Sequence, residues 1–333
     1  MLAANITAKK PLIPFAMNLG LPLRFINTLL SPSGKAARLS ILIYHRVLDI
    51  PDPLFPGEVD ALRFDEQLTA LRQTFQFLPL SEAIQRLRDH SLPARSACIT
   101  FDDGYADNAT IALPLLLKHQ IPATFFIASG YLNGGCMFND RVAHLVRQSG
   151  DSLDLQWLDL GILSLTTLAS RRQAFATLIN QIKYRPPEAR RSILDRLESE
   201  SAISPPTHLM MTAEQLLQLD GAGMELGGHT VNHPILASLN PDDARHEIEE
   251  NRDYLTQLTG KRPQVFAYPN GKLGQDYHPL HANLVKEAGY QGAVATDAGV
   301  STRHSDPYHL PRFTPWDQNI RRFTLRMTRN LYG

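Results

Sequence analysis

The segment ACITFDDG, residues 97–104, indicates the fold class of this chain. Residues 97–101 are a short, mainly apolar run that predicts a β-strand. Two carboxylates and a glycine, Asp102, Asp103 and Gly104, follow the strand at once. Active sites of parallel α/β folds form at the carboxyl ends of the strands. The segment therefore predicts both a strand of a parallel sheet and a candidate catalytic position at its end.

Short apolar runs and helical periods alternate on both sides of this segment. Further strands are predicted at residues 41–44, 123–127, 224–227, 265–268 and 292–295, with 310–312 as a candidate last strand. Helices are predicted at 64–75, from a cap at Ser81, at 108–118, 213–219 and 282–288, and between the cap Asn240 and the stop Gly260. About seven strand–helix units favour a parallel sheet closed into a barrel over an open sheet.

Three segments depart from this alternation and define the predicted organisation. Residues 1–38 are expected to be an irregular or surface-lying N-terminal extension, because prolines and a glycine interrupt the apolar stretch behind Lys9 and Lys10. Residues 39–318 would form the barrel domain, with a helical insertion at about 139–210 placed over one mouth of the barrel, where it could shape a substrate cleft. Residues 319–333 predict a basic terminal helix, which either packs with its basic side in water or contacts an anionic membrane or acidic glycan.

Composition excludes several classes of protein. Lys plus Arg and Asp plus Glu number 33 each, so the chain has no charge that would favour nucleic acid. Only Cys98 and Cys136 occur, which excludes a disulfide framework and a cysteine-rich zinc site. No apolar run reaches membrane-spanning length, and no clear cleavage site follows the N-terminal stretch. We therefore expect a cytoplasmic protein, with peripheral membrane contact through the termini as the alternative to free solution.

Polar residues follow four of the predicted strands. They are His45 after the first strand, the carboxylate pair at 102–103, the histidine segment 229–233, and the segment 268–271. A barrel brings the carboxyl ends of its strands together, so we expect these groups to meet at one site.

Two histidines and one carboxylate make a candidate metal site. His229 and His233 are four residues apart, which on a helical turn would project both imidazoles from one face. Thr230 stands where zinc-protease helices carry a glutamate, so the protease interpretation fails. With Asp103 the set suits Zn²⁺ and would also accept Fe²⁺, Co²⁺ or Ni²⁺. The alternatives are a solvated turn at 102–103 and two structural histidines.

Three motifs resemble those of a known family. The segments TFDDG (100–104), HTVNH (229–233) and FAYPNG (266–271), in this order, resemble the polysaccharide deacetylase (NodB-homology, carbohydrate esterase family 4-like) family over roughly residues 39–315, apart from the insertion. The resemblance implies a distorted (β/α)7-type barrel that removes acetyl groups from N-acetylated sugars. It also implies Asp102 as the catalytic base and the metal ligands Asp103, His229 and His233.

The end of the first predicted strand resembles one branch of the family, whereas the third motif departs from the family's usual pattern. The pair Tyr44 and His45 resembles the first-strand motif of the branch that includes poly-N-acetylglucosamine deacetylases. In that branch a histidine on the first strand replaces the usual general acid. Ala267 and Asn270 stand where the family commonly carries an arginine and a tyrosine. The arginine normally orients the base, and we expect Arg312 to replace it.

The implied reaction is hydrolysis of an amide in an N-acetylated glycan. A bound metal would activate the attacking water, Asp102 would take its proton, and His45 would protonate the leaving amine. A backbone N–H near Asn270 could assist the oxyanion, and Tyr268, Pro269 and Tyr105 could contact the sugar, although the tyrosines also fit core positions. The rival hypotheses are a carbohydrate-binding protein without turnover and an O-acetyl esterase.

Overall fold

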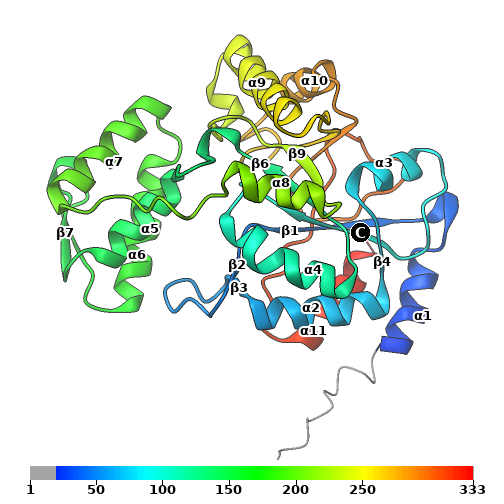
Figure 1. Cartoon of the computed structure of the whole chain (residues 1–333). Coiled ribbons are helices and arrows are strands. Elements are labelled where there is room, and N and C mark those ends of the chain that lie inside the picture. The colour runs from blue at the N-terminus through cyan, green and yellow to red at the C-terminus, as the bar shows by residue number, and fades with distance from the viewer. Residues whose placement is uncertain (1–19, 333) are drawn as a thin grey trace, which may run out of the picture.

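The computed structural model describes residues 20–332, and its centre is a curled parallel sheet (Figure 1). The strands lie in the order β1 (Leu39–Tyr44), β5 (Ser96–Phe101), β6 (Ala123–Ile127), β9 (Glu225–Gly228), β10 (Val265–Ala267) and β11 (Gly292–Val294). A short strand, β4 (Gln76–Phe77), pairs with β5 outside this path. Leu310 bridges to Val294 of β11 and Phe313 bridges to Leu42 of β1, so residues 310–313 connect the two edges. The predicted distorted barrel is confirmed.

Strands of the sheet are buried on both faces, which explains their mainly apolar sequences. In β5, Ile99 and Phe101 pack in a core shared with the covering helices. Cys98, which precedes Ile99 and lies on the other face, packs with residues of β1, β6, β10 and β11. A strand that contributes to two cores cannot show polar alternation.

Helices follow the strands and cover the outer face of the sheet (Figure 1). They are α2 (Ala61–Thr74), α4 (Leu113–His119), α8 (Ala213–Gly221), α9 (Pro241–Thr259) and α10 (Pro279–Glu287), whereas α3 (Leu80–Arg88) packs with Cys98 in the core on the other face. The predicted helix at 108–118 is a π-helical turn, Asn108–Ala112, that continues into α4. Two short strands, β2 (Val47–Leu48) and β3 (Val59–Asp60), form a separate pair beside β1.

Local capping chemistry sets several helix ends as predicted, and one differently. Thr212 and Gln215 form a capping box on α8, and Asn240 caps α9. The predicted cap at Ser81 is wrong, because α3 begins one residue earlier. The carboxylate of Glu225, from β9, accepts hydrogen bonds from the N–H groups of Leu80 and Ser81 at 2.9 and 3.2 Å. An acidic side chain distant in sequence therefore accepts the hydrogen bonds of the free N–H groups at the start of this helix.

The segment between β6 and α8 folds around a core of its own. It contains α5 (Phe138–Gln148), the hairpin β7 (Ser152–Asp154) and β8 (Ile162–Ser164), α6 (Leu168–Ile182) and α7 (Pro187–Ser201). Val142, Leu178 and Leu194 are among its buried residues. Figure 1 shows these elements in green, to one side of the sheet. The domain boundaries remain a prediction.

Helices lie at both ends of the described chain. Helix α1 (Gly20–Leu30) occupies part of the segment expected to be irregular, while Lys9 and Lys10 lie outside the described residues. Helix α11 (Ile320–Asn330) starts after the cap Asn319, within the predicted basic terminal helix. Among residues 20–332, no helix is both long and apolar enough to cross a bilayer.

Candidate metal centre and active site

The three predicted metal ligands meet at the carboxyl ends of β5 and β9. The Nε2 atoms of His229 and His233 lie 3.3 and 3.4 Å from Oδ1 of Asp103. One donor atom from each residue lies within 4.8 Å of the other two. Residues separated by more than a hundred positions in the chain are therefore within reach of one cation.

The backbone at both segments turns sharply to aim these side chains. Asp103 and Gly104 have φ values of 78° and 92°, so the chain leaves β5 through two left-handed residues. Thr230 and His233 also have positive φ, at 65° and 49°. The predicted helical turn for the two histidines is wrong, because a run of right-handed residues cannot include these two conformations. The imidazoles meet through a looped backbone instead.

Helix α9 holds the histidine loop in place with two buried or half-buried polar residues. The side-chain amide of Asn251 accepts from the N–H of His229 at 3.1 Å and donates to the carbonyls of Thr230 and Ile127 at 2.7 and 2.9 Å. One turn earlier, the carboxylate of Glu247 accepts from the N–H of Val231 at 2.8 Å. Sequence reasoning missed both residues, because polar positions on an amphipathic helix normally indicate its solvent face.

The donor set fits a divalent metal ion. Oδ1 of Asp103 is buried and has no hydrogen-bond partner, which is costly unless a cation binds it. Tetrahedral ligands with bonds of about 2.0–2.1 Å lie about 3.3 Å apart, which is close to the observed separations from this atom. Nδ1 of His229 lies 2.7 Å from the carbonyl of Ala267, so an N–H there leaves Nε2 free as a ligand.

The charge states of the ligands also suit a cation. Burial disfavours the charged form of Asp103, yet the nearby imidazoles of His229, His233 and His45 hold the pKa of its carboxyl well below the usual range. Burial lowers the pKa of His233 to about 3, so its imidazole is neutral and can donate a lone pair. The site thus offers one anionic and at least one neutral ligand at neutral pH.

Arg312, the residue expected to replace the missing arginine, contacts the second carboxylate of the pair. Its Nη1 and Nη2 each donate to one oxygen of Asp102 at 2.7 Å, and both residues are buried. Nε of Arg312 donates to the carbonyl of Ala295 at 2.8 Å. Burial opposes ionisation, but this arginine lowers the pKa of Asp102 below its ordinary value. Asp102 is therefore ionised beside the candidate metal ligands.

His45 lies at the mouth of the same site. It is exposed, lines a cavity together with Asp103, and its backbone carbonyl accepts from the side chain of Asn108 at 2.9 Å. His45 is therefore not a buried structural histidine. Its position leaves the imidazole open to a ligand.

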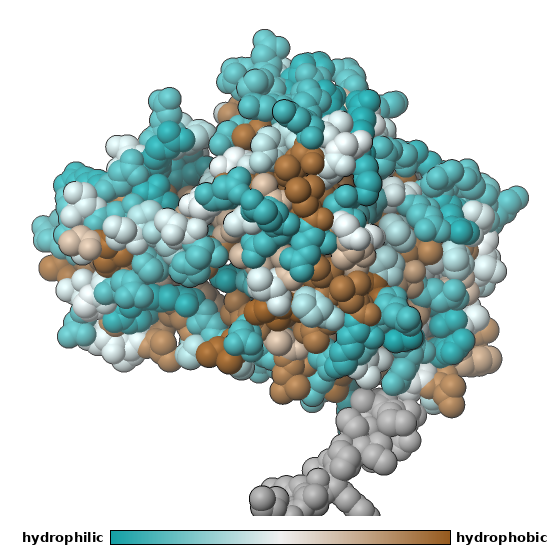
Figure 2. All heavy atoms as spheres, viewed as in Figure 1, coloured by the Kyte–Doolittle hydropathy of each residue, from teal (hydrophilic) through white to brown (hydrophobic). Residues whose placement is uncertain are grey.

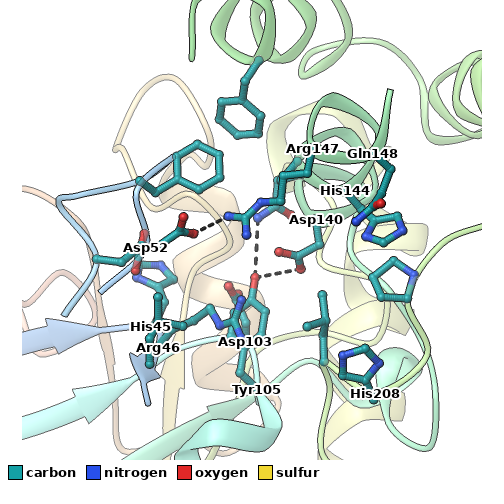
Figure 3. A pocket seen from close by; sticks show the side chains of 18 residues that line it. His45, Arg46, Asp52, Asp103, Tyr105, Asp140, His144, Arg147, Gln148 and His208 are labelled. Carbon is teal, nitrogen blue, oxygen red and sulfur yellow. Dashed lines mark hydrogen bonds and ion pairs between the residues drawn. The ribbon is translucent and has the colours of Figure 1, made fainter. Parts of the chain in front are cut away.

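A cavity of about 580 Å³ extends from Asp103 to the inserted helices (Figure 3). One face of α5 forms a wall, and the β2–β3 loop and residues 206–209 form others. The hydroxyl of Tyr105 donates to Oδ2 of Asp140 at 2.9 Å, and Arg147 pairs with Asp52 across the cavity. Sequence reasoning found Tyr105 here but missed the residues of the insertion, which carry no recognisable motif. The lining residues it missed include Asp52, Asp140, His144, Arg147 and His208.

Other predicted substrate contacts lie elsewhere. Tyr268 is fully buried, its ring stacks on Tyr277 with centroids 3.7 Å apart, and its hydroxyl donates to the carbonyl of Tyr308. The prediction that Tyr268 contacts the sugar is therefore wrong, because its side chain packs in the core between the sheet and α10. Pro269 and Asn270 are not among the residues that line the cavity.

A model of the polysaccharide deacetylase family matches residues 89–154 and 180–293. The chain is 21% identical over 283 residues to the polysaccharide deacetylase homologue YxkH of Bacillus subtilis (strain 168), covering 84% of this chain and 71% of that protein.

Two solved structures share the fold. The Streptococcus pyogenes deacetylase PplD in complex with acetate aligns with a TM-score of 0.56 at 20% identity, covering 84% of this chain and 92% of that one. IcaB from Ammonifex degensii aligns with a TM-score of 0.57 at 19% identity, covering 91% and 99%.

Proposed function

We propose that this chain, which belongs to the polysaccharide deacetylase family of hydrolases, removes N-acetyl groups from an acetylated polysaccharide in a metal-dependent reaction. The observation that carries the proposal is the meeting of Asp103, His229 and His233 at 3.3–3.4 Å beside the ionised Asp102. Deacetylation of acetylated polysaccharides is the activity of the family. The metal, the amide substrate and the residue roles are our inference.

Asp103, His229 and His233 would hold the metal, with Zn²⁺ as the best match to the donor set and Fe²⁺, Co²⁺ or Ni²⁺ as alternatives. When bound, such an ion supplies Lewis acidity, which lowers the pKa of a water and polarises the acetyl carbonyl.

Asp102 serves as the general base in this proposal. Each of its oxygens accepts one hydrogen bond from Arg312, and a carboxylate oxygen has a second lone pair that can take a proton from water. Arg312 is a positioning residue, because it contacts the base and fixes both the rotamer and the charge of the carboxylate.

His45 is the proposed donor of the proton that the leaving amine requires. It is the exposed imidazole in the cavity wall next to Asp103, and both carboxylates, at 102 and 103, are close enough to interact with its charge. From this place its imidazole would face a bound substrate.

The cavity fits a sugar ring with its acetamido group directed at the metal ligands. Phe55 and Phe175 provide apolar surface, and Tyr105, His144 and Gln148 provide hydrogen-bonding groups. Sugars present both apolar ring faces and hydroxyls, so this mixture supports an N-acetylated glycan as partner.

The experiment is an acetate-release assay on N-acetylated oligosaccharides with each divalent metal, comparing wild type with Asp102→Asn. We expect acetate and a free amine from wild type, and a rate loss of roughly 10²–10⁴-fold in the variant with its metal content unchanged. Release of an alcohol instead of an amine would support the O-acetyl esterase alternative. Absence of acetate with every metal would leave the protein a binding module and contradict the proposal.

A further inference from the structure

Helix α1 presents an apolar stripe to solvent. Leu21, Phe25 and Leu29 follow one another at intervals of four residues and are 79%, 67% and 66% exposed. The opposite side of the helix, with Leu23 and Asn27, is buried. A surface helix normally turns its apolar stripe to the core, so an outward stripe indicates a partner surface. Figure 2 shows hydrophobic residues at the lower right, over the place of α1 in Figure 1.

Helix α11 adds basic and apolar side chains beside this stripe. Arg322, Leu325, Arg329 and Tyr332 lie at helical intervals and are exposed, while Phe323 and Met327 between them are buried. Helices α1 and α11 contact each other and both pack on α2. We call the exposed side chains of α1 and α11 the terminal face.

Charge on the terminal face is one-sided. The sequence has no Asp or Glu in residues 1–48 or after Asp317, although the whole chain has a formal net charge of zero. Asp317, which precedes α11, is buried and pairs with Arg322 at 3.2 Å and with Arg326. Within the described residues, Arg329 has no acidic partner. The face therefore carries net positive charge.

A surface hollow lies at the side of α11 and combines cations with aromatic rings. Its volume is about 590 Å³, and it is lined by Trp316, Tyr332 and the arginines 322, 326 and 329. Trp316 is 63% exposed and Tyr332 is 72% exposed. Exposed aromatic rings among basic side chains suit the headgroup layer of a bilayer, where rings take the interfacial region and cations meet lipid phosphates.

We propose that the terminal face docks on an anionic lipid surface, with the α1 stripe in the headgroup region and the α11 arginines on the phosphates. A second copy of this chain is a poorer occupant, because two positive faces repel each other. The segment preceding α1 is also a poorer one, since Lys9 and Lys10 repeat the same charge and no acid accompanies them. The proposal is independent of the deacetylase chemistry.

The test is co-sedimentation of the full chain with vesicles of phosphatidylglycerol and phosphatidylcholine, compared with pure phosphatidylcholine, at low salt. We expect binding to the anionic vesicles that falls as salt is added, and roughly tenfold weaker binding for Phe25→Glu and for Arg329→Glu. The matched controls are Leu280→Glu and Lys286→Glu, exposed positions on α10 at the far end of the molecule, which should bind like wild type.

Three results would overturn the proposal. They are no binding to anionic vesicles at low salt, equal binding to neutral vesicles, and equal losses in the α10 controls. Size-exclusion chromatography with light scattering tests the alternative that a second copy of this chain binds the face. If wild type is a dimer that Phe25→Glu converts to a monomer, and wild type does not bind vesicles, the face is a contact between copies. Acetate release from a soluble substrate should be unchanged in the Phe25 and Arg329 variants, which separates this outcome from a failure of the enzyme assignment.

Discussion

Arg312 and Asp102 form a fully buried pair, so their individual contributions can be tested by removing one partner. Arg312→Met should leave a buried carboxylate without its cation, which costs about 3–5 kcal/mol of unfolding free energy. It should also raise the pKa of Asp102, so the acidic limb of the kcat/KM profile should move to higher pH. Urea denaturation and the pH–rate profile measure the two effects.

A lost rate with an unmoved acidic limb would indicate that Arg312 has only a structural role. Arg312→Lys is the matched variant, because it keeps the charge but loses the bidentate geometry. It should retain the position of the limb better than Arg312→Met.

Asp140 provides a pH-dependent test in the cavity wall. Burial raises the pKa of its carboxyl to about 6, against about 3.9 in an unfolded chain. The folded state therefore holds more protons between these values, so this group lowers stability as pH rises from about 4 to about 6. In metal-free protein, Asp140→Asn should raise the unfolding free energy by about 1–2 kcal/mol at pH 8 and by little at pH 4.

The comparison that isolates this effect is Asp151→Asn, an exposed acid of the same insertion, which should show no such pH dependence. Equal stabilisation of Asp140→Asn at both pH values would contradict the assigned pKa. Urea midpoints at the two pH values are sufficient.

Individual side chains show what the sequence could indicate and where it could not. Asp103, His229 and His233 were identifiable because acids and histidines directly after apolar strands are uncommon outside functional sites. The conformation of their backbone was not predictable, because the interval of four residues between His229 and His233 also fits a helix. Tyr268 was misplaced because a strand end gives no indication of which face a side chain takes, and here it meets Tyr277 of the outer core.

At the scale of elements, α9 supports the histidine loop, residues 229–233, through Asn251. Asn251→Ala would leave the N–H of His229 unpaired in a buried place and would remove one hydrogen bond each from the carbonyls of Thr230 and Ile127. We expect a loss of about 2–4 kcal/mol in unfolding free energy and weaker metal binding, because the loop loses its support. Thermal unfolding with and without added metal gives both quantities.

The control for this helix is Glu250→Ala, an exposed neighbour on α9 that pairs with His246. It should change stability by less than about 0.5 kcal/mol and leave metal binding intact. If Asn251→Ala binds metal as tightly as wild type, the proposed support of the loop is wrong.

Most elements were predictable because each carries its own signal, and the exceptions depend on distant partners. Thr212, Asn240 and Gly260 mark helix ends by local chemistry alone. The start of α3 depends on Glu225 from another strand, which no local pattern reveals.

At the scale of the whole molecule, two distant segments complete the site. Residues 310–313 run between β11 and β1 and bring Arg312 onto Asp102 from the end of the barrel domain. The insertion places one face of α5 across from His45 and closes a cavity that the barrel alone would leave open. The sequence predicts barrel closure from the number of strand–helix units, but the cleft wall depends on how a segment with a separate core docks on the barrel.

The central claim is that one divalent metal ion binds Asp103, His229 and His233 while Asp102 remains outside the ligand set. Titration calorimetry of metal-free protein with Zn²⁺, together with elemental analysis, tests it on wild type, Asp103→Asn and Asp102→Asn. We expect one ion per chain for wild type and for Asp102→Asn, and none at comparable affinity for Asp103→Asn. Full metal binding by Asp103→Asn would contradict it.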